Sequence, residues 1–331
     1  MLLILKNFKT KIPTVTSFAS MSSTGSFRKS HSYNNRRPHS SQQSNSNNNP
    51  NKQISASLKS PYPIIDIGAN INKANYKHDL DRVLDRSLEA NVTNIIITGT
   101  DMKNSGLAVR ICQDNKSKVK LYCTVGVHPH YSKDFNDDTI NLMRGIIKKH
   151  PNIVKSVGEC GLDFNRNYSP QDIQIQSFDK QVALAVELNL PLFLHEREAH
   201  QDLITVLQKH YVDGKLPVKA VIHCFTGTKD EAKYYIEQGY YIGFTGVICQ
   251  EQRGRTLREV IKDVVPIERI MIETDCPFMF PDNKYRDEFN GRNEPCLLPA
   301  VSKTIATCKG LSEEEVAKTL TANTLKFFNL E

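Results

Sequence analysis

Four side chains of the kinds that bind divalent metal ions occur where strand-like apolar segments end. They are Glu159, His195, His223 and Asp275. A single carboxylate in such a place is usually a solvated loop residue. Four such endings in one chain indicate a shared site, because imidazole and carboxylate groups together are typical ligands of borderline or hard divalent ions.

A site of this composition predicts metal-assisted hydrolysis. A bound ion can lower the pKa of a water molecule and polarise the oxygens of a phosphoryl or carbonyl group. A carboxylate such as Glu159 can bridge two ions about 3.5–4 Å apart. Imidazole favours zinc or manganese, and carboxylates also admit magnesium. We therefore expect hydrolysis at phosphorus or at a carbonyl carbon.

Strand-like and helix-like segments alternate from residue 61 onward. The strand candidates are residues 64–70, 94–100, 120–127, 153–157, 190–195, 219–223, 240–245 and 269–274. Segments with apolar residues three and four apart lie between them, including residues 80–90, 139–149, 171–188, 201–211 and 256–264. Helical crossovers imply a parallel sheet. The length of residues 61–331 favours an α/β fold with a single (β/α)8 TIM barrel of about 250 residues. An open doubly wound sheet is the alternative.

The active site of a barrel lies at the carboxyl ends of its strands. The segment before Glu159 has the alternation of a strand, and Gly158 and Gly161 then favour a turn and close backbone approach. We therefore expect the fourth strand to end at Val157. Ligand-type residues follow the other strands too, and the shared mouth should hold Asp66, Asn70, His128, His130, Glu159, His195, His223 and Asp275.

The first sixty residues differ in composition from the rest. Of 43 Lys and Arg and 36 Asp and Glu in the chain, residues 1–60 hold nine basic and no acidic residues, which leaves 34 basic and 36 acidic residues in 61–331. The basic character of the whole chain therefore does not predict a basic surface on the body. The Ser- and Asn-rich composition of 1–60 predicts a disordered extension, because it cannot bury enough apolar surface to order itself.

The extension also bears on the location of the protein. Its acid-free, apolar and basic opening resembles a mitochondrial transit peptide. A low-complexity segment without a targeting signal is equally compatible with this composition. No apolar run is long enough to span a membrane. The eight cysteines lack C-x-x-C spacing, which favours reduced thiols in an intracellular protein.

Seven short motifs in the body resemble those of one family, the TatD-type metal-dependent deoxyribonucleases among the amidohydrolase-like barrels. They are Asp-Ile-Gly-Ala-Asn (66–70), Thr-Gly-Thr (98–100), Gly-Val-His-Pro-His (126–130), Gly-Glu-Cys-Gly-Leu-Asp-Phe (158–164), His-Cys-Phe-Thr-Gly (223–227), Glu-Thr-Asp-Cys-Pro (273–277) and Arg-Asn-Glu-Pro (292–295). The resemblance covers about residues 64–330.

The resemblance implies a 3′-to-5′ exonuclease that acts on DNA, with single strands or 3′ ends preferred. It implies two divalent ions per subunit, bridged by Glu159, with His195 and His223 at one ion. Asp275 would bind the other ion and take a proton from the attacking water. A nuclear or cytosolic location also follows from the resemblance, with the mitochondrion as the alternative.

One motif departs from the family pattern. Many members open with Asp-x-His-x-His, whereas Gly68 and Asn70 stand in the two histidine places here. Asp66 and Asn70 are therefore expected to be weaker ligands, and we predict one tightly and one loosely held ion.

Four further residues are candidates for substrate contact. His128 and Arg166 could bind phosphate, Arg166 in a bidentate manner. The resemblance suggests that Asn293 and Glu294 orient the mouth and contact the substrate.

Two other functions fit the same residues. One is a small-molecule or aminoacyl-ester hydrolase with the same metals, and the other is a non-catalytic nucleic-acid-binding barrel. The presence of all four principal ligands argues against the second. A nuclease needs local positive charge, for which Arg253, Arg255 and Arg258 are one candidate cluster.

Overall fold

A computed structural model of the protein describes residues 58–330. It contains one sheet of eight parallel strands in sequence order. The strands are β1 (Ile64–Ala69), β2 (Val92–Ile97), β3 (Lys120–Val125), β4 (Val154–Asp163), β5 (Leu192–Arg197), β6 (Ala220–Ile222), β7 (Tyr241–Phe244) and β8 (Ile270–Ile272). A doubly wound sheet would reverse its strand order at a switch point. The unbroken order confirms the predicted (β/α)8 barrel.

The first and last strands meet just beyond the end of β8. Ala69 forms a parallel bridge with Cys276. The main-chain N–H of Asp275 donates to the carbonyl of Gly68 at 2.8 Å, and that of Asn70 donates to the carbonyl of Cys276 at 2.9 Å. These bonds bring the segment after β8 against the carboxyl end of β1, so residues from both ends of the domain reach one mouth.

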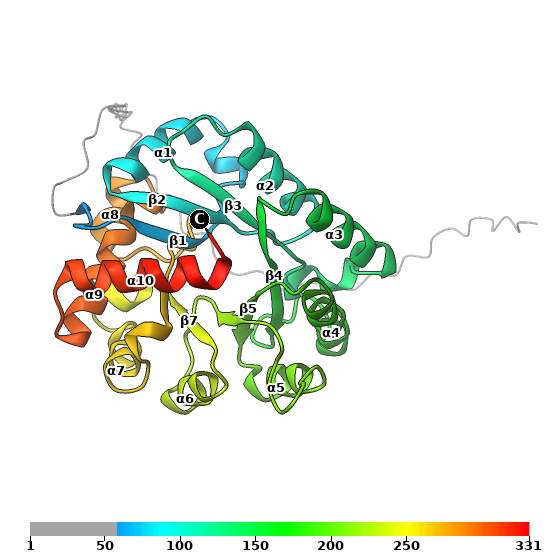
Figure 1. Ribbon diagram of the computed structural model, residues 1–331. Coiled ribbons are helices and arrows are strands. Elements are labelled where there is room, and N and C mark those ends of the chain that lie inside the picture. Colours follow the sequence, from blue (N-terminus) through cyan, green and yellow to red (C-terminus); the bar gives the residue numbers. More distant parts are fainter. Residues whose placement is uncertain (1–57, 331) are drawn as a thin grey trace, which may run out of the picture. The chain divides into compact units, whose positions relative to one another are not determined.

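Helices surround the strands (Figure 1). They are α1 (Leu80–Glu89), α2 (Met102–Asp114), α3 (Asp137–Lys149), α4 (Gln171–Leu188), α5 (His200–Gln208), α6 (Lys229–Glu237), α7 (Arg255–Asp263), α8 (Asn283–Glu288), α9 (Leu298–Lys309) and α10 (Glu313–Phe328). Capping boxes begin α3, α6 and α10 and satisfy main-chain N–H groups that have no partner within the helix. Within residues 58–330, no helix combines the length and apolar character needed to cross a bilayer.

The interior of the barrel is filled by apolar side chains at its amino-terminal end. This cluster contains Ile65, Ile67, Ile96, Phe193, Val221, Tyr241, Met271, Phe327, Phe328 and Leu330. The last three come from the end of α10 and the residues after it. Asn323 of α10 also donates from Nδ2 to the carbonyls of Ile267 and Ile270, at the start of β8. The base of the barrel is therefore closed, and the polar residues lie toward the opposite end.

The expected end of the fourth strand at Val157 is wrong. Strand β4 continues to Asp163, with a register shift between Gly158 and Cys160. A Cβ atom on Gly158 would lie 2.3 Å from the carbonyl oxygen of Phe193, and one on Gly161 would lie 1.9 Å from that of His195. The two glycines therefore allow β4 and β5 to approach closely instead of ending the strand. The prediction of a close backbone approach at Gly158 and Gly161 is confirmed, and the prediction of a turn there is wrong.

The packed domain begins slightly before residue 61. Leu58 is buried in the core, and the main-chain N–H of Ser60 donates to the carbonyl of Ala90 at 3.1 Å. The expectation of a disordered, targeting extension concerns residues that lie outside the described part, apart from residues 58–60. All eight cysteines are free thiols, as predicted from their spacing.

Candidate metal centre

Three imidazoles surround one carboxylate oxygen at the carboxyl end of the barrel. Oε1 of Glu159 lies 2.7 Å from Nε2 of His223, 3.1 Å from Nδ1 of His195 and 3.2 Å from Nε2 of His128. Ligand atoms of His128, Glu159 and His195 lie within 4.8 Å of one another, which makes them a group able to hold a metal ion. Strands β4 and β5 supply Glu159 and His195 from within their length, whereas His128 and His223 follow β3 and β6.

The electrostatic surroundings keep Glu159 ionised. Burial by itself would raise the pKa of this carboxyl, but His223 and His128 hold it well below its ordinary value. Burial opposes a charge on His223 as well, yet Glu159 and Glu273 raise its pKa well above the ordinary value. Burial lowers the pKa of His128 to about 4. His128 is therefore neutral near pH 7, which is the form of imidazole that binds metals.

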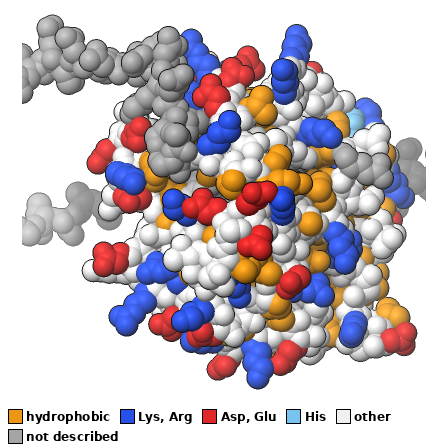
Figure 2. Space-filling view, turned by 60° about the vertical axis from the view of Figure 1, so that its left-hand side comes forward, with side chains coloured by type: hydrophobic (Ala, Val, Ile, Leu, Met, Phe, Trp, Pro, Cys, Tyr) orange, Lys and Arg blue, Asp and Glu red, His pale blue; other side chains and the backbone are white. Residues whose placement is uncertain are grey.

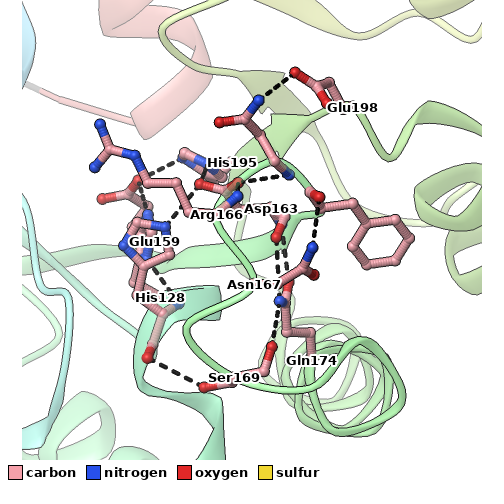
Figure 3. A network of polar contacts seen from close by, with 12 residues as sticks. His128, Glu159, Asp163, Arg166, Asn167, Ser169, Gln174, His195 and Glu198 are labelled. Carbon is pink, nitrogen blue, oxygen red and sulfur yellow. Dashed lines mark hydrogen bonds and ion pairs between the residues drawn. The ribbon is translucent and has the colours of Figure 1, made fainter. Parts of the chain in front are cut away.

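His195 has a ring nitrogen that its protein neighbours leave without a hydrogen bond. Its Nδ1 faces Glu159, whereas its Nε2 is buried without a hydrogen-bond partner. The nearby Oδ2 atom of Asp163 lies 3.5 Å from this nitrogen and 2.7 Å from Nε2 of His130. Buried polar atoms nearly always have a partner. An ion near His195 would supply one, so the donor set fits a bound divalent cation (Figure 3).

A second carboxylate lies behind His223, on the side away from Glu159. Oε2 of Glu273 lies 3.3 Å from Nδ1 of His223, and its Oε1 accepts the main-chain N–H of Cys224. Glu273 is fully buried. A Cβ atom on Gly68 would lie 2.2 Å from Oε2 of Glu273 and one on Gly243 would lie 2.7 Å from its Oε1, so the two glycines make room for this carboxylate. Glu273 thereby fixes the ring of His223 with Nε2 toward Glu159.

Asp275 follows β8 and is only partly exposed. Its Oδ1 accepts a hydrogen bond from Nδ2 of Asn70 at 3.0 Å. Desolvation raises the pKa of Asp275 to about 7, against the opposing effect of His223. Its φ of 47° is an uncommon conformation for a residue other than glycine. Asp275 is thus a carboxylate held in a defined orientation beside the cluster around Glu159.

Asp66 lies within β1 rather than at its end, and it is fully buried. Its Oδ1 accepts the main-chain N–H groups of Gly68 and Thr274, and its Oδ2 accepts the hydroxyl of Thr274. Burial raises the pKa of Asp66 to about 7. These contacts tie β1 to the segment after β8. Within residues 58–330, neither Asp66 nor Asp275 belongs to a close group of three His, Cys, Asp or Glu side chains such as His128, Glu159 and His195.

The expected substrate contacts have different surroundings. His128 belongs to the group around Glu159, and its contact with phosphate stays a prediction. Arg166 is exposed on the loop after β4, and its main-chain N–H donates to Oδ1 of Asp163 at 2.9 Å. Figure 3 shows its side chain extending from this loop toward Glu159 and His195. Arg166 is therefore placed to reach a ligand at the mouth.

Asn293 and Glu294 are buried, and protein partners occupy their polar atoms. Nδ2 of Asn293 donates to the carbonyls of Thr274 and Phe278. The carboxylate of Glu294 accepts Nε of Arg86 at 2.8 Å and Nη2 of Arg292 at 2.6 Å. These contacts fasten the segments after β8 to each other and to α1. These contacts give both residues a supporting role at the mouth, and their direct contact with substrate stays a prediction.

Glu273 and Asp163 were not among the residues predicted for the site, although the sequence contains a signal for both. Side chains two residues apart in an extended strand share a face. Glu159 and Asp163 are four residues apart in β4, and Glu273 precedes Asp275 by two. Once β4 is known to continue past Glu159, the same alternation that selected Glu159 also selects Asp163.

Known proteins resemble this chain over most of its length. The family model described as TatD related DNase matches residues 65–329. A protein of Pantoea ananatis named 3′-5′ ssDNA/RNA exonuclease TatD is 40% identical over 269 residues, which are 81% of this chain and 100% of the relative. A protein of the same name from Erwinia tasmaniensis is 39% identical over 269 residues, with the same coverage.

Solved structures lead to the same family. A TatD family hydrolase from Entamoeba histolytica superposes with a TM-score of 0.72 at 28% identity, over 81% of this chain and 98% of that one. A TatD homologue from Escherichia coli gives the same values. The resemblance noted from the motifs is thereby confirmed. The chain belongs to the TatD related DNase family.

Proposed function

We propose that this protein is a divalent-metal-dependent exonuclease that removes nucleotides from the 3′ end of single-stranded nucleic acid. The observation that carries the proposal is the convergence of His128, His195 and His223 on one oxygen of Glu159. Relatives named as 3′-5′ ssDNA/RNA exonucleases, about 40% identical over their full length, support the substrate class. We propose DNA as the substrate, with RNA included in the test.

The residues of the candidate site have two roles, metal binding and proton transfer. Glu159, His128, His195 and His223 would hold an ion, which when bound supplies the Lewis acidity that polarises a phosphate and acidifies water. The histidine content favours zinc or manganese, and magnesium remains compatible with the carboxylates. Asp275 would accept the proton of the attacking water, since a carboxyl with a pKa near 7 is well matched to that role.

We further propose a second, more weakly held ion between Glu159 and Asp275, with Asn70 and Asp66 as the remaining ligands. The weakness follows from the contacts of these residues. Both oxygens of Asp66 accept hydrogen bonds from Thr274, and the amide of Asn70 donates to Asp275. An ion here would have to compete with these bonds.

The positive charge that a nuclease needs must be local. On the face seen in Figure 2, Lys and Arg side chains are interspersed with Asp and Glu side chains. Arg258 is unsuited to the role expected for it, because its guanidinium donates to the carbonyls of Ile248, Gln250 and Glu251. We therefore propose Arg166, which is exposed beside the cluster, as the phosphate-binding arginine.

The test is an assay of the purified protein with single-stranded DNA and RNA labelled at the 5′ end. We expect stepwise shortening from the 3′ end that chelator abolishes and added metal restores. Aminoacyl esters and simple amides are assayed in parallel. Turnover of these with no shortening of either nucleic acid would establish the alternative hydrolase. Metal-independent binding without any turnover would establish the non-catalytic barrel.

We also propose that the protein is intracellular, in the nucleus or cytosol, with the mitochondrion as the alternative. The acid-free, basic composition of residues 1–60 supports the alternative. A fusion of these residues to a fluorescent reporter separates the two, since a transit peptide moves the reporter into mitochondria and any other segment leaves it elsewhere.

A further inference from the structure

Exposed aromatic side chains gather in the loops at the carboxyl end of the barrel. Within residues 58–330, the exposed large apolar side chains include three aromatic ones, Tyr131, Tyr168 and Phe278, with exposures of 43%, 60% and 51%. They follow β3, β4 and β8 respectively. The exposed aliphatic residues lie on α3 or in connections outside these loops, and they are Leu142, Val212 and Leu311. The mouth is thus distinguished by aromatic rings.

Two of these rings adjoin the candidate metal centre. The ring of Tyr168 lies 4.7 Å from that of His130, which in turn lies 4.3 Å from that of His128. The ring of Tyr131 lies 6.4 Å from that of His128 on the same side. All of these pairs meet edge to face. Tyr168 is therefore two ring contacts away from a residue of the metal-binding group.

The third ring stands on the other side of the mouth. Strands β4 and β8 are separated by three strands in either direction around an eight-stranded barrel, so their loops face each other across it. The main-chain N–H of Phe278 donates to the carbonyl of Asp275 at 3.0 Å. Nζ of Lys73 lies 5.3 Å from the centre of the Phe278 ring. Phe278 is thus tied to the proposed proton acceptor and has a positive charge beside it.

We propose that Tyr168 and Phe278 each stack against one of the two bases that flank the phosphodiester to be cleaved, with Tyr131 extending the Tyr168 side. The inference rests on the proposed nuclease function and specifies how the substrate is selected. Exposed rings offer base-stacking surfaces that tolerate any base. Exposed Lys133 and Arg166 lie in the same loops as the two tyrosines and provide charge for the backbone.

This arrangement requires the flanking bases to be unstacked and unpaired. In a duplex, neighbouring bases cover the faces that Tyr168 and Phe278 would contact. The two aromatic residues would therefore discriminate single strands from duplexes without reading base identity. They act on binding and positioning of the terminal nucleotides, while Glu159 and Asp275 act on the reacting phosphate.

The test compares Tyr168→Ala and Phe278→Ala with the wild-type protein, with Leu142→Ala as a control of similar exposure away from the mouth. Binding of a labelled single-stranded oligonucleotide is measured by fluorescence anisotropy in chelator, and KM and kcat are measured with metal. Each mouth variant should weaken binding and raise KM by about tenfold, the effect of losing one stacked base. Leu142→Ala and Tyr168→Phe should match the wild type, because the first lies elsewhere and the second keeps the ring.

Abasic substrates assign the stacked bases. One substrate lacks the base of the terminal nucleotide, and a second lacks the base of the penultimate nucleotide. Tyr168→Ala should bind one of these substrates as well as the wild type does, and Phe278→Ala should bind the other as well as the wild type does. Unchanged binding by both alanine variants, or an effect that persists with both abasic substrates, would overturn the inference. Weakened binding without any metal-dependent shortening would instead reject the nuclease function and leave the stacking role in place.

Discussion

Nε2 of His223 lies 2.7 Å from Oε1 of Glu159, although the two residues are 64 positions apart in the chain. The contact joins the residue after β6 to the middle of β4. It places an imidazole whose pKa is raised well above its ordinary value against a buried carboxylate, and the same oxygen also faces His195 and His128. Removing one member should therefore disturb the whole cluster.

Glu159→Gln should abolish stabilisation of the protein by metal. The amide keeps the shape but loses the charge that attracts an ion. For the wild type, free metal at about one hundred times Kd should contribute about 2.7 kcal/mol, which is a rise in Tm of roughly 5 °C for a domain of this size. Calorimetry with and without metal measures the difference. An equal rise in Glu159→Gln would show that Glu159 is not a ligand.

Asp275→Asn should lower kcat by at least about a hundredfold, because the variant loses both the proton acceptor and its negative charge. Binding of single-stranded DNA should persist. The assay is run at saturating metal, with the thermal unfolding transition as a check on folding. Near-normal turnover in a folded Asp275→Asn variant would exclude the proposed role in activating water.

Gly68→Ala should act through Glu273 and His223. The new Cβ atom would lie 2.2 Å from Oε2 of Glu273, so this fully buried carboxylate would have to move. We expect a loss of about 1–3 kcal/mol in unfolding free energy and about a tenfold higher metal concentration for half-maximal activity. Gly145→Ala in α3 is the matched control, since a Cβ atom there meets nothing within 4 Å. It should leave metal dependence unchanged.

Glu294→Gln separates a supporting role from substrate contact. The substitution leaves Arg86 and Arg292 with a neutral partner in a largely buried network. We expect a loss on the order of 3 kcal/mol in unfolding free energy, with KM for single-stranded DNA within about twofold of wild type at a temperature where the variant is folded. Equilibrium urea unfolding and steady-state kinetics measure the two effects. A large rise in KM with unchanged stability would support the substrate-binding role instead.

Deletion of residues 1–57 should leave folding and chelator-sensitive activity intact. The cut falls before Leu58, which is buried in the core, so every core residue in the described range 58–330 is kept. A longer deletion that includes Leu58 and Ser60 should lower Tm, because it removes a buried side chain and the hydrogen bond of Ser60 to Ala90. Equal Tm values for the two truncations would show that residues 58–60 do not contribute to stability.

The sequence by itself determined the fold and much of the candidate site. Helical and strand periodicities arise from local geometry, so the eight alternating units and a parallel sheet were evident from residue order. Chain length favoured a closed barrel over an open doubly wound sheet, and the observed strand order decided between them. The placement of Glu159, His195, His223 and Asp275 at one end followed from that fold, since parallel strands deliver their carboxyl ends to one edge. The resemblance to the family motifs added the expected reaction, which is metal-dependent hydrolysis of DNA.

Tertiary structure decided what each of these side chains contacts. Gly158 and Gly161 signal a turn as readily as a close approach between strands, and only the neighbouring backbone of β5 shows which applies. Glu294 is a carboxylate in a motif for which substrate contact was predicted. Its hydrogen-bond partner Arg86 lies 208 positions away in the chain and is brought to it by folding. Burial and partners at long sequence separation are properties of packing, and no local pattern encodes them.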